Sequence, residues 1–136
     1  MTQGYRDSAM RHRADAAHLA GGERFQNAGH LIGLAAECLV KSLLEEAGVV
    51  VAPRTPFWRH FPDLGRRVVA IEGKSPLMRL LAPIVAKGDD FLRGWELEDR
   101  YASTVPITDG RPRYESWEQD VATLFEAAGL PGWNVI

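Results

Sequence analysis

The chain has 136 residues and a formal net charge of −2 at pH 7, with 46% hydrophobic and 25% charged residues. These values are typical of a soluble globular domain with a real core, so we expect residues 1–136 to form a single domain. They exclude a strongly basic nucleic-acid-binding composition, and the single cysteine excludes a disulfide framework within the chain. Because no stretch approaches the roughly 18 apolar residues of a membrane-spanning helix and no leader pattern opens the chain, we expect a cytoplasmic protein without membrane contact.

A first helix is predicted over residues 7–20. Asp7 or Ser8 can cap its amino end, and the Gly21–Gly22 pair ends it. The short link that follows makes this helix an antiparallel neighbour of the next one. Three polar residues fall on one side of it, and the first two are spaced to form an ion pair: Arg11, Asp15 and His18.

The longest uninterrupted helical pattern covers residues 24–47. It contains no proline and is followed by Gly48, a residue suited to the position just after a helix. Gly29 and Gly33 lie within it, although each glycine costs about 0.5–1 kcal/mol of helix stability relative to alanine. We expect close packing of a neighbouring helix to compensate. Its apolar residues recur on one broad face: Phe25, Ala28, Ile32, Ala35, Leu39 and Leu43.

A narrow polar line follows the same helix, made of Asn27, His30, Glu37 and Lys41 with Leu34 among them. Glu37 and Lys41 stand in the favourable order for an ion pair one turn apart. Two interpretations of the line are open. It is either a solvated face of the helix or the partly buried wall of a groove shared with the polar side of the first helix.

Residues 49–59 are predicted to form a connecting loop, because prolines interrupt them. Two aromatic residues follow one another in this loop, Phe57 and Trp58. We interpret both as core residues beneath the loop, with a base-stacking role as the alternative.

The rest of the chain predicts three more helices. Pro62 suits the first turn of a third helix that reaches about residue 71, and Ser75–Pro76 starts a fourth that reaches about residue 87, kinked at Pro83. Residues 94–113 form the least regular stretch, and a final helix runs from residue 114 or 115 to 128. The whole pattern predicts an all-α up-and-down bundle of four to six helices, with a long irregular loop before the last helix.

Short motifs between residues 8 and 46 carry a resemblance to a known family. They are RHRADAAH (Arg11, His12, Asp15, His18), NAGHL (Asn27, Ala28, His30) and GLAAEC followed by Lys41, with weaker echoes at HFPDL (residues 60–64) and at Trp95 with Arg100–Tyr101. In these motifs the chain resembles the prokaryotic HEPN-type helical domains. The resemblance implies an all-α bundle, often a homodimer, often in toxin–antitoxin or defence systems. Some members are metal-independent ribonucleases and others bind only nucleotides or partners, so the resemblance leaves the activity open.

No metal-binding or phosphate-loop motif occurs in the sequence, and we predict no cofactor and no metal. The resemblance offers one catalytic motif, an arginine followed about four to six residues later by a histidine, which the nuclease members carry in the last helix. Here every histidine matches that spacing, Arg54 with His60 included, and no histidine follows His60. If the chain is an enzyme, we select Arg24 and His30 as catalytic residues, with Asn27 between them as a polar helper, because a helix N-terminus attracts phosphate. The alternative is that His30 is a structural hydrogen-bonding residue.

In this chemistry, an imidazole moves the 2′-hydroxyl proton of RNA while a guanidinium holds the phosphate. In a second candidate site, Arg100 and Tyr101 pack against the polar line and Glu37 binds the guanidinium group of Arg100. Together they form a pocket for a phosphate or a base. In its alternative, Trp95 and Tyr101 anchor the loop on the bundle and Arg100 pairs with a neighbouring aspartate at the surface. The predicted binding residues are Asp15, His18, Glu37, Lys41, Arg100 and Tyr101.

The functional prediction is a HEPN-like bundle that binds RNA or a nucleotide and forms a homodimer by close helix packing. It is also predicted to be the toxin-like member of a two-component system, beside a small nucleotidyltransferase-type partner protein. Whether it is an enzyme that cleaves RNA is left open. Two alternatives belong to other classes: a non-catalytic protein-interaction module, and a sensor that binds a small nucleotide.

Overall fold

The computed structural model describes residues 4–69, 81, 83–85, 91–97 and 107–129. Within these ranges all regular secondary structure is helical, which confirms the all-α prediction. Residues 81 and 83–85 are helical as well. The longer elements, in chain order, are α1 (Tyr5–Gly21), α2 (Phe25–Glu46), α3 (Asp63–Val69) and α5 (Ile107–Ala127).

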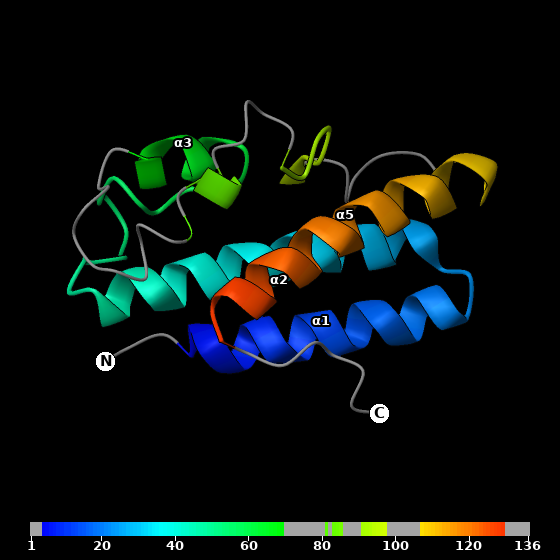
Figure 1. Ribbon diagram of the computed structural model, residues 1–136, viewed down its shortest axis with the longest axis horizontal. Helices are drawn as coiled ribbons and strands as arrows, with labels where there is room; N and C mark the ends of the chain where they lie inside the picture. The colour runs from blue at the N-terminus through cyan, green and yellow to red at the C-terminus, as the bar shows by residue number, and fades with distance from the viewer. Residues whose placement is uncertain (1–3, 70–80, 82, 86–90, 98–106, 130–136) are drawn as a thin grey trace.

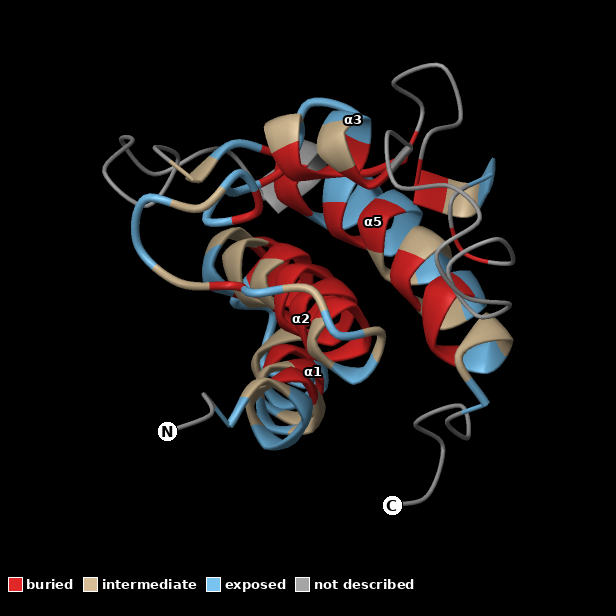
Figure 2. Ribbon diagram, turned by 90° about the vertical axis from the view of Figure 1, so that its left-hand side faces the viewer, coloured by how far each residue is buried: buried red, intermediate tan, exposed pale blue. Residues whose placement is uncertain are grey.

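The central element is α2, with α1 running antiparallel along one side and α5 crossing the other (Figure 1). Figure 2 shows that burial is concentrated on α2, where 15 of 22 residues are buried. The predicted apolar face is part of this buried surface, from Phe25 to Leu43. A helix that is covered on most sides belongs to the core rather than to the surface of a bundle.

The ends of α1 and α2 show which local signals decide a helix boundary. α1 begins after Gly4 without a side-chain cap, so the predicted cap at Asp7 or Ser8 is wrong. The carboxyl end of α2 is as predicted, because Gly48 adopts a φ of +85°. The backbone N–H of Gly48 donates a hydrogen bond to the carbonyl of Glu45 (3.0 Å), and the N–H of Val49 donates one to the carbonyl of Leu44 (2.9 Å). This pair of hydrogen bonds is a Schellman motif, which satisfies carbonyls that the helix leaves free.

Gly29 and Gly33 let two indole rings lie directly on α2. A Cβ atom on Gly33 would overlap the ring of Trp95, and one on Gly29 would lie 2.8 Å from Cζ3 of Trp117. Trp95 also donates its Nε1 hydrogen to the carbonyl of Gly29 at 2.9 Å. Close packing is found at both glycines, but the predicted neighbouring helix supplies it only at Gly29, where Trp117 belongs to α5, because Trp95 at Gly33 lies outside the helices. It is made by side chains of the same chain, so the glycines cannot also be the helix contact of the predicted homodimer.

The later helices depart from the prediction at their ends. α3 begins at Asp63 and is described to Val69, whereas the predicted fourth helix lies mostly outside the described residues. α5 begins at Ile107, so the last part of the stretch 94–113, predicted to be irregular, is helical. Pro112 lies inside α5 and removes only one backbone donor. The buried Tyr114 and residues beyond it supply the packing that holds this helix.

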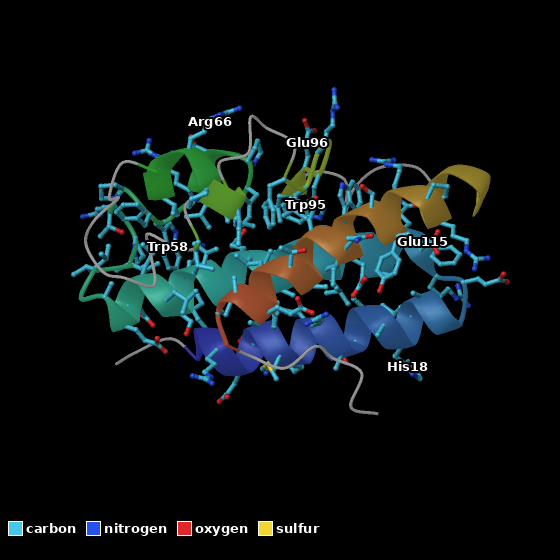
Figure 3. The ribbon with its side chains drawn as sticks, viewed as in Figure 1. His18, Trp58, Arg66, Trp95, Glu96 and Glu115 are labelled. Carbon is cyan, nitrogen blue, oxygen red and sulfur yellow. The ribbon has the colours of Figure 1, made fainter. Side chains whose placement is uncertain are left out.

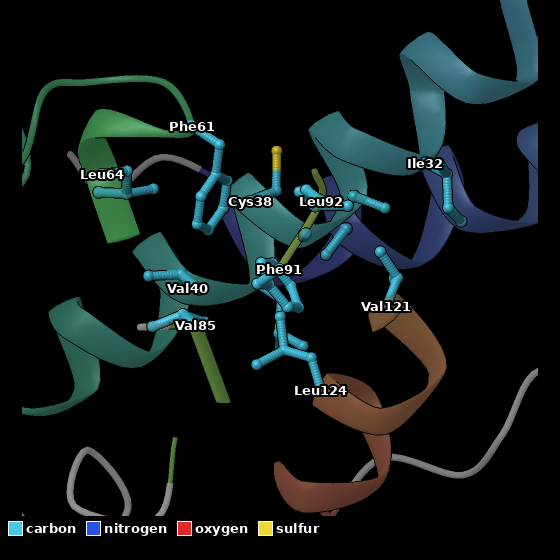
Figure 4. Packing of buried hydrophobic residues seen from close by; sticks show 14 of the residues in the cluster. Ile32, Cys38, Val40, Phe61, Leu64, Val85, Phe91, Leu92, Val121 and Leu124 are labelled. Carbon is cyan, nitrogen blue, oxygen red and sulfur yellow. The ribbon is translucent and has the colours of Figure 1, made fainter. Parts of the chain in front are cut away.

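The core joins all parts of the described chain. Figure 4 shows side chains of α2, α3 and α5 meeting in one cluster with Val85, Phe91 and Leu92. Phe61 and Phe91 contact each other there, with ring centroids 5.5 Å apart. The cluster anchors the loop that follows α2 at both of its ends, and this loop carries part of the candidate site.

Candidate functional site

A buried carboxylate on α2, that of Glu37, organises the most unusual polar contacts of the molecule. Its Oε2 accepts a hydrogen bond from Nζ of Lys41 at 3.0 Å, and its Oε1 lies 2.8 Å from Nδ1 of His60. The side chains of Glu37 and Lys41 are only 7% and 6% exposed, whereas that of His60 is 49% exposed. The predicted ion pair is confirmed, and the solvated-face interpretation is wrong for this half of the polar line.

The contact with Glu37 sets the orientation of the His60 ring. A carboxylate oxygen accepts hydrogen bonds, so the His60 tautomer that satisfies this contact carries its hydrogen on Nδ1 and donates it to Oε1. In the neutral ring, Nε2 then holds the free lone pair. A buried carboxylate behind a half-exposed imidazole is an arrangement that prepares a histidine to accept a proton from a bound molecule.

Two aromatic rings flank the ammonium group of Lys41. Its Nζ lies 5.3 Å from the ring centroid of Trp58 and 5.8 Å from that of Tyr5. Burial raises the pKa of Tyr5 above its usual value of 10.0, and the negative charge of Glu45 adds to the effect. We call the group of Tyr5, Glu37, Lys41, Trp58 and His60 the Glu37 cluster.

The two aromatic residues of the loop after α2 have different environments. Phe57 is buried, as predicted, but Trp58 is 42% exposed, so its interpretation as a core residue is wrong. Figure 3 labels Trp58 near the carboxyl end of α2 and shows Arg66 extending outward from α3. The exposed indole thus belongs to the surface of the Glu37 cluster rather than to the core.

Positive charge gathers in residues 54–67, which we call the basic segment. Four arginines against one aspartate give it a charge of +3 with His60 neutral, so the remainder of the chain carries −5 of the total of −2. Asp63 holds two of these arginines in place, with its Oδ2 at 3.7 Å from Nε of Arg59 and 3.4 Å from Nε of Arg67. Arg54 and Arg66 are exposed. The surface next to His60 is therefore suited to an anion.

The predicted catalytic residues lie at the opposite end of α2. Arg24 is the exposed residue just before the helix, Asn27 is exposed, and His30 is partly buried. The ring of His30 stacks on Trp95, with centroids 6.1 Å apart and planes inclined by 13°. Since a helix rises about 1.5 Å per residue, His30 is roughly 16 Å along the axis from Lys41, too far for one compact site.

The predicted binding residues of α1 do not face α2. Asp15 and His18 are exposed, and Figure 3 shows His18 pointing away from the bundle. The predicted pair of Arg11 with Asp15 is not the contact found, because Arg11 donates to Oγ of Ser8 at 3.1 Å. The groove predicted between the polar sides of the two helices is therefore wrong.

The buried polar residue of α1 is Arg13 instead. Its guanidinium lies 4.6 Å from the ring centroid of Phe125 and its Nη2 is 3.4 Å from Oε1 of Glu118, both on α5. Burial, with the charge of Glu118 adding to it, raises the pKa of the neighbouring Tyr114 to about 12. This contact joins α1 to α5.

Arg100 and Tyr101 lie outside the described residues, so the pocket predicted from them has no described counterpart. Within the described part, both oxygens of Glu37 are engaged, by Lys41 and His60. Cys38, next to Glu37, is buried, and burial raises the pKa of its thiol to about 11. So high a pKa leaves little thiolate at neutral pH.

The sequence did not predict the contact partner of His60. Two weak signals marked it, the spacing from Arg54 and the HFPDL motif, but neither names a partner. The hydrogen bond to Glu37 spans 23 residues of sequence, so no local spacing predicts it.

The described residues contain no group of three or more His, Cys, Asp or Glu side chains placed to hold a metal ion. Over the same residues, no helix has the length and apolar character needed to cross a membrane. Comparisons of the chain with protein-family models, with curated proteins and with solved structures give no match. Function is therefore proposed from the residues of the site.

Proposed function

We propose that this protein is a HEPN-like helical bundle that binds RNA or a nucleotide at the Glu37 cluster and the basic segment. The observation that supports the proposal is the placement of His60. Its Nδ1 is held at 2.8 Å by a buried carboxylate while its ring is 49% exposed. It stands next to Arg59 and among the other arginines of the basic segment. A fixed imidazole beside guanidinium groups suits a phosphate ester of a nucleotide chain.

The charge distribution supports an anionic ligand. The basic segment carries +3 on a chain whose net charge is −2, so positive charge is concentrated in this segment, where it attracts a polyanion. Asp63 pairs at the surface with Arg59 and Arg67, so both guanidinium groups lie around one carboxylate. Local charge of this kind supports a single binding surface rather than general affinity for nucleic acid.

The chemistry proposed for the site is metal-independent cleavage of RNA. Nε2 of His60 takes the proton of a 2′-hydroxyl, the 2′-oxygen bonds to the adjacent phosphorus, and the bond from phosphorus to the 5′-oxygen breaks. The 5′-oxygen leaves with a proton from solvent and a 2′,3′-cyclic phosphate remains, while an arginine of the basic segment stabilises the charge that grows on the phosphate. Arg54, six residues before His60, is the arginine with the spacing of the family motif. The proposal includes the toxin-like role, the homodimer and the nucleotidyltransferase-type partner that the family resemblance implies.

The first prediction tests this chemistry. Purified protein is incubated with mixed single-stranded RNA in EDTA, beside His60→Asn, the double variant Arg24→Ala/His30→Ala, and His18→Asn as the control for an exposed histidine. We expect cleavage by the parent and by His18→Asn. Loss of a general base lowers rates by about 10²–10⁴-fold, so His60→Asn should be slower by at least about 100-fold. Circular dichroism and thermal unfolding check that each variant is folded.

Other outcomes of this experiment have distinct meanings. Loss of cleavage in the Arg24→Ala/His30→Ala variant alone would place the site at the amino end of α2. RNA binding without cleavage by any protein would leave a binding protein that is not a nuclease. Failure of the parent to retain RNA in a filter-binding assay would contradict the proposal.

A second candidate function is a protein-interaction module. Val50 and Trp58 are 66% and 42% exposed on the same loop, and exposed apolar side chains are a feature of protein contacts. A thermal-shift screen with a nucleotide panel separates this function from the nucleotide sensor, because a ligand at 100 times its Kd adds about 2.7 kcal/mol of stability. No shift with any nucleotide, together with no RNA binding, would favour the module.

A further inference from the structure

Trp58 differs from the other described tryptophans in its exposure. Trp95 and Trp117 are buried and donate their Nε1 hydrogens to backbone carbonyls at 2.9 and 2.8 Å. Trp58 is 42% exposed although it lies next to the buried Phe57. Moving a large aromatic side chain out of water lowers the free energy. An indole held at the surface therefore favours contact with a flat apolar ligand.

The inner face of the Trp58 ring is fixed by Lys41. The ammonium lies 5.3 Å from the ring centroid and is itself held by Glu37 at 3.0 Å. Lys41 is buried and paired with Glu37, which keeps its ammonium group on this face of the ring. We call the opposite face of the indole the outer face, and it is the face left for a stacking ligand.

A cation on one face of an aromatic ring draws electron density toward itself. The opposite face then favours an electron-rich stacking partner. Purines are more electron-rich than pyrimidines and offer a larger area, and stacking strength is a known source of base preference in single-strand binding. Bases inside a duplex are already stacked and do not present their faces to a side chain.

We propose that the outer face of Trp58 is a stacking subsite for one unpaired purine base of a bound nucleic acid strand. This inference rests on the proposed function and names the part of the ligand that the site recognises. The arginines of the basic segment hold the phosphates of the same strand, since Arg59 directly follows Trp58 in the chain. Base recognition and phosphate binding are thus separate contributions to affinity.

The second prediction measures this preference. Labelled 2′-O-methyl oligonucleotides, A10 and U10, are titrated at fixed salt by fluorescence anisotropy, because the methyl group blocks attack by the 2′-oxygen. We expect the parent to bind A10 several-fold more tightly than U10. Stacking contributions correspond to roughly 5- to 150-fold in affinity, so Trp58→Leu should weaken A10 binding within that range and remove the difference between A10 and U10.

Two further variants and one spectroscopic measurement complete the test. Trp58→Phe keeps a smaller ring and should bind A10 with intermediate affinity. Val50→Ala changes the other exposed apolar residue of the loop and should bind as the parent does. A 2-aminopurine placed within A10 should lose fluorescence on binding the parent and retain it with Trp58→Leu.

The results distinguish the inference from the function on which it rests. Equal binding of A10 and U10 by the parent, or unchanged A10 binding by Trp58→Leu, would overturn the stacking subsite and leave RNA binding intact. Failure of the parent to bind either oligonucleotide would overturn both. If Trp58→Leu does not fold, the 2-aminopurine signal and the Trp58→Phe affinity decide the question.

Discussion

At the scale of single residues, the buried carboxylate of Glu37 gives the candidate site its character. Moving an ion out of water costs several kcal/mol, and the hydrogen bonds from Lys41 and His60 offset that cost. Removing one partner of a buried pair typically destabilises a protein by about 3–5 kcal/mol. Substitutions at Glu37 or Lys41 therefore change stability and function together. The half-exposed His60 is the better residue for testing function, because Lys41 still pairs with Glu37 when His60 is replaced.

His12 gives a prediction at the same scale. It is partly buried, and desolvation, with the charge of Arg11 adding to it, lowers its pKa below 6.5. The unfolded chain then binds more protons than the folded chain below pH 6.5, so stability falls as the pH drops through this range. We expect the parent to lose more unfolding free energy than His12→Gln between pH 7 and pH 5, measured by urea denaturation. An equal or smaller loss in the parent would show that this histidine is not desolvated.

At the scale of elements, α2 is the helix on which the other parts are assembled. α1 packs along it through the small residues Ala9 and Ala16, and two indoles lie against its glycines. The glycines reduce the intrinsic helix stability, but they allow Trp95 and Trp117 to be buried. Burying a side chain of this size outweighs a loss of about 1 kcal/mol per glycine.

Substitution of these glycines tests the packing. Gly33→Ala places a Cβ atom in the ring of Trp95, whereas Gly21→Ala adds one with nothing within 4 Å. Overpacking costs about 1–3 kcal/mol, so we expect Gly33→Ala to lower the free energy of unfolding by that amount in urea denaturation. Gly21→Ala should change it by less than about 0.5 kcal/mol. Equal effects of the two substitutions would mean that Trp95 does not occupy the Gly33 position in solution.

At the scale of the whole molecule, charge is divided unequally. The basic segment carries +3 and the remainder −5, so this segment can attract polyanions although the net charge of the chain is −2. The net charge of the chain therefore does not indicate the class of ligand, whereas the positions of the charged residues do. The Glu37 cluster adjoins this basic surface because the loop after α2 carries both His60 and the first two arginines of the segment.

Salt dependence tests this division of charge. The slope of log Kd against log salt changes by about 0.7 for each phosphate contact to a single strand. Arg66→Ala should therefore weaken binding of an RNA oligonucleotide and reduce the slope by about 0.7. Arg111→Ala removes an exposed arginine of α5 that pairs with Glu115, and it should leave the slope unchanged. A change with Arg111→Ala alone would place the binding surface at α5.

The sequence by itself determined the all-α class, the positions of α1 and α2, the apolar face of α2 and the stop at Gly48. These features depend on residues within about one or two turns of each other, and such short-range patterns can be read directly along the chain. The ion pair of Glu37 with Lys41 belongs to the same group, because its partners stand one turn apart.

Only the tertiary structure decided which polar residues are buried and what they contact. His60 reaches Glu37 across 23 residues, and Trp95 reaches Gly29 across 66. The exposure of Trp58, the burial of Arg13 and the outward position of His18 were also decided by packing. The physical reason is that burial depends on which elements cover a surface. A helical period shows which residues share a face, but not which other part of the chain lies against that face.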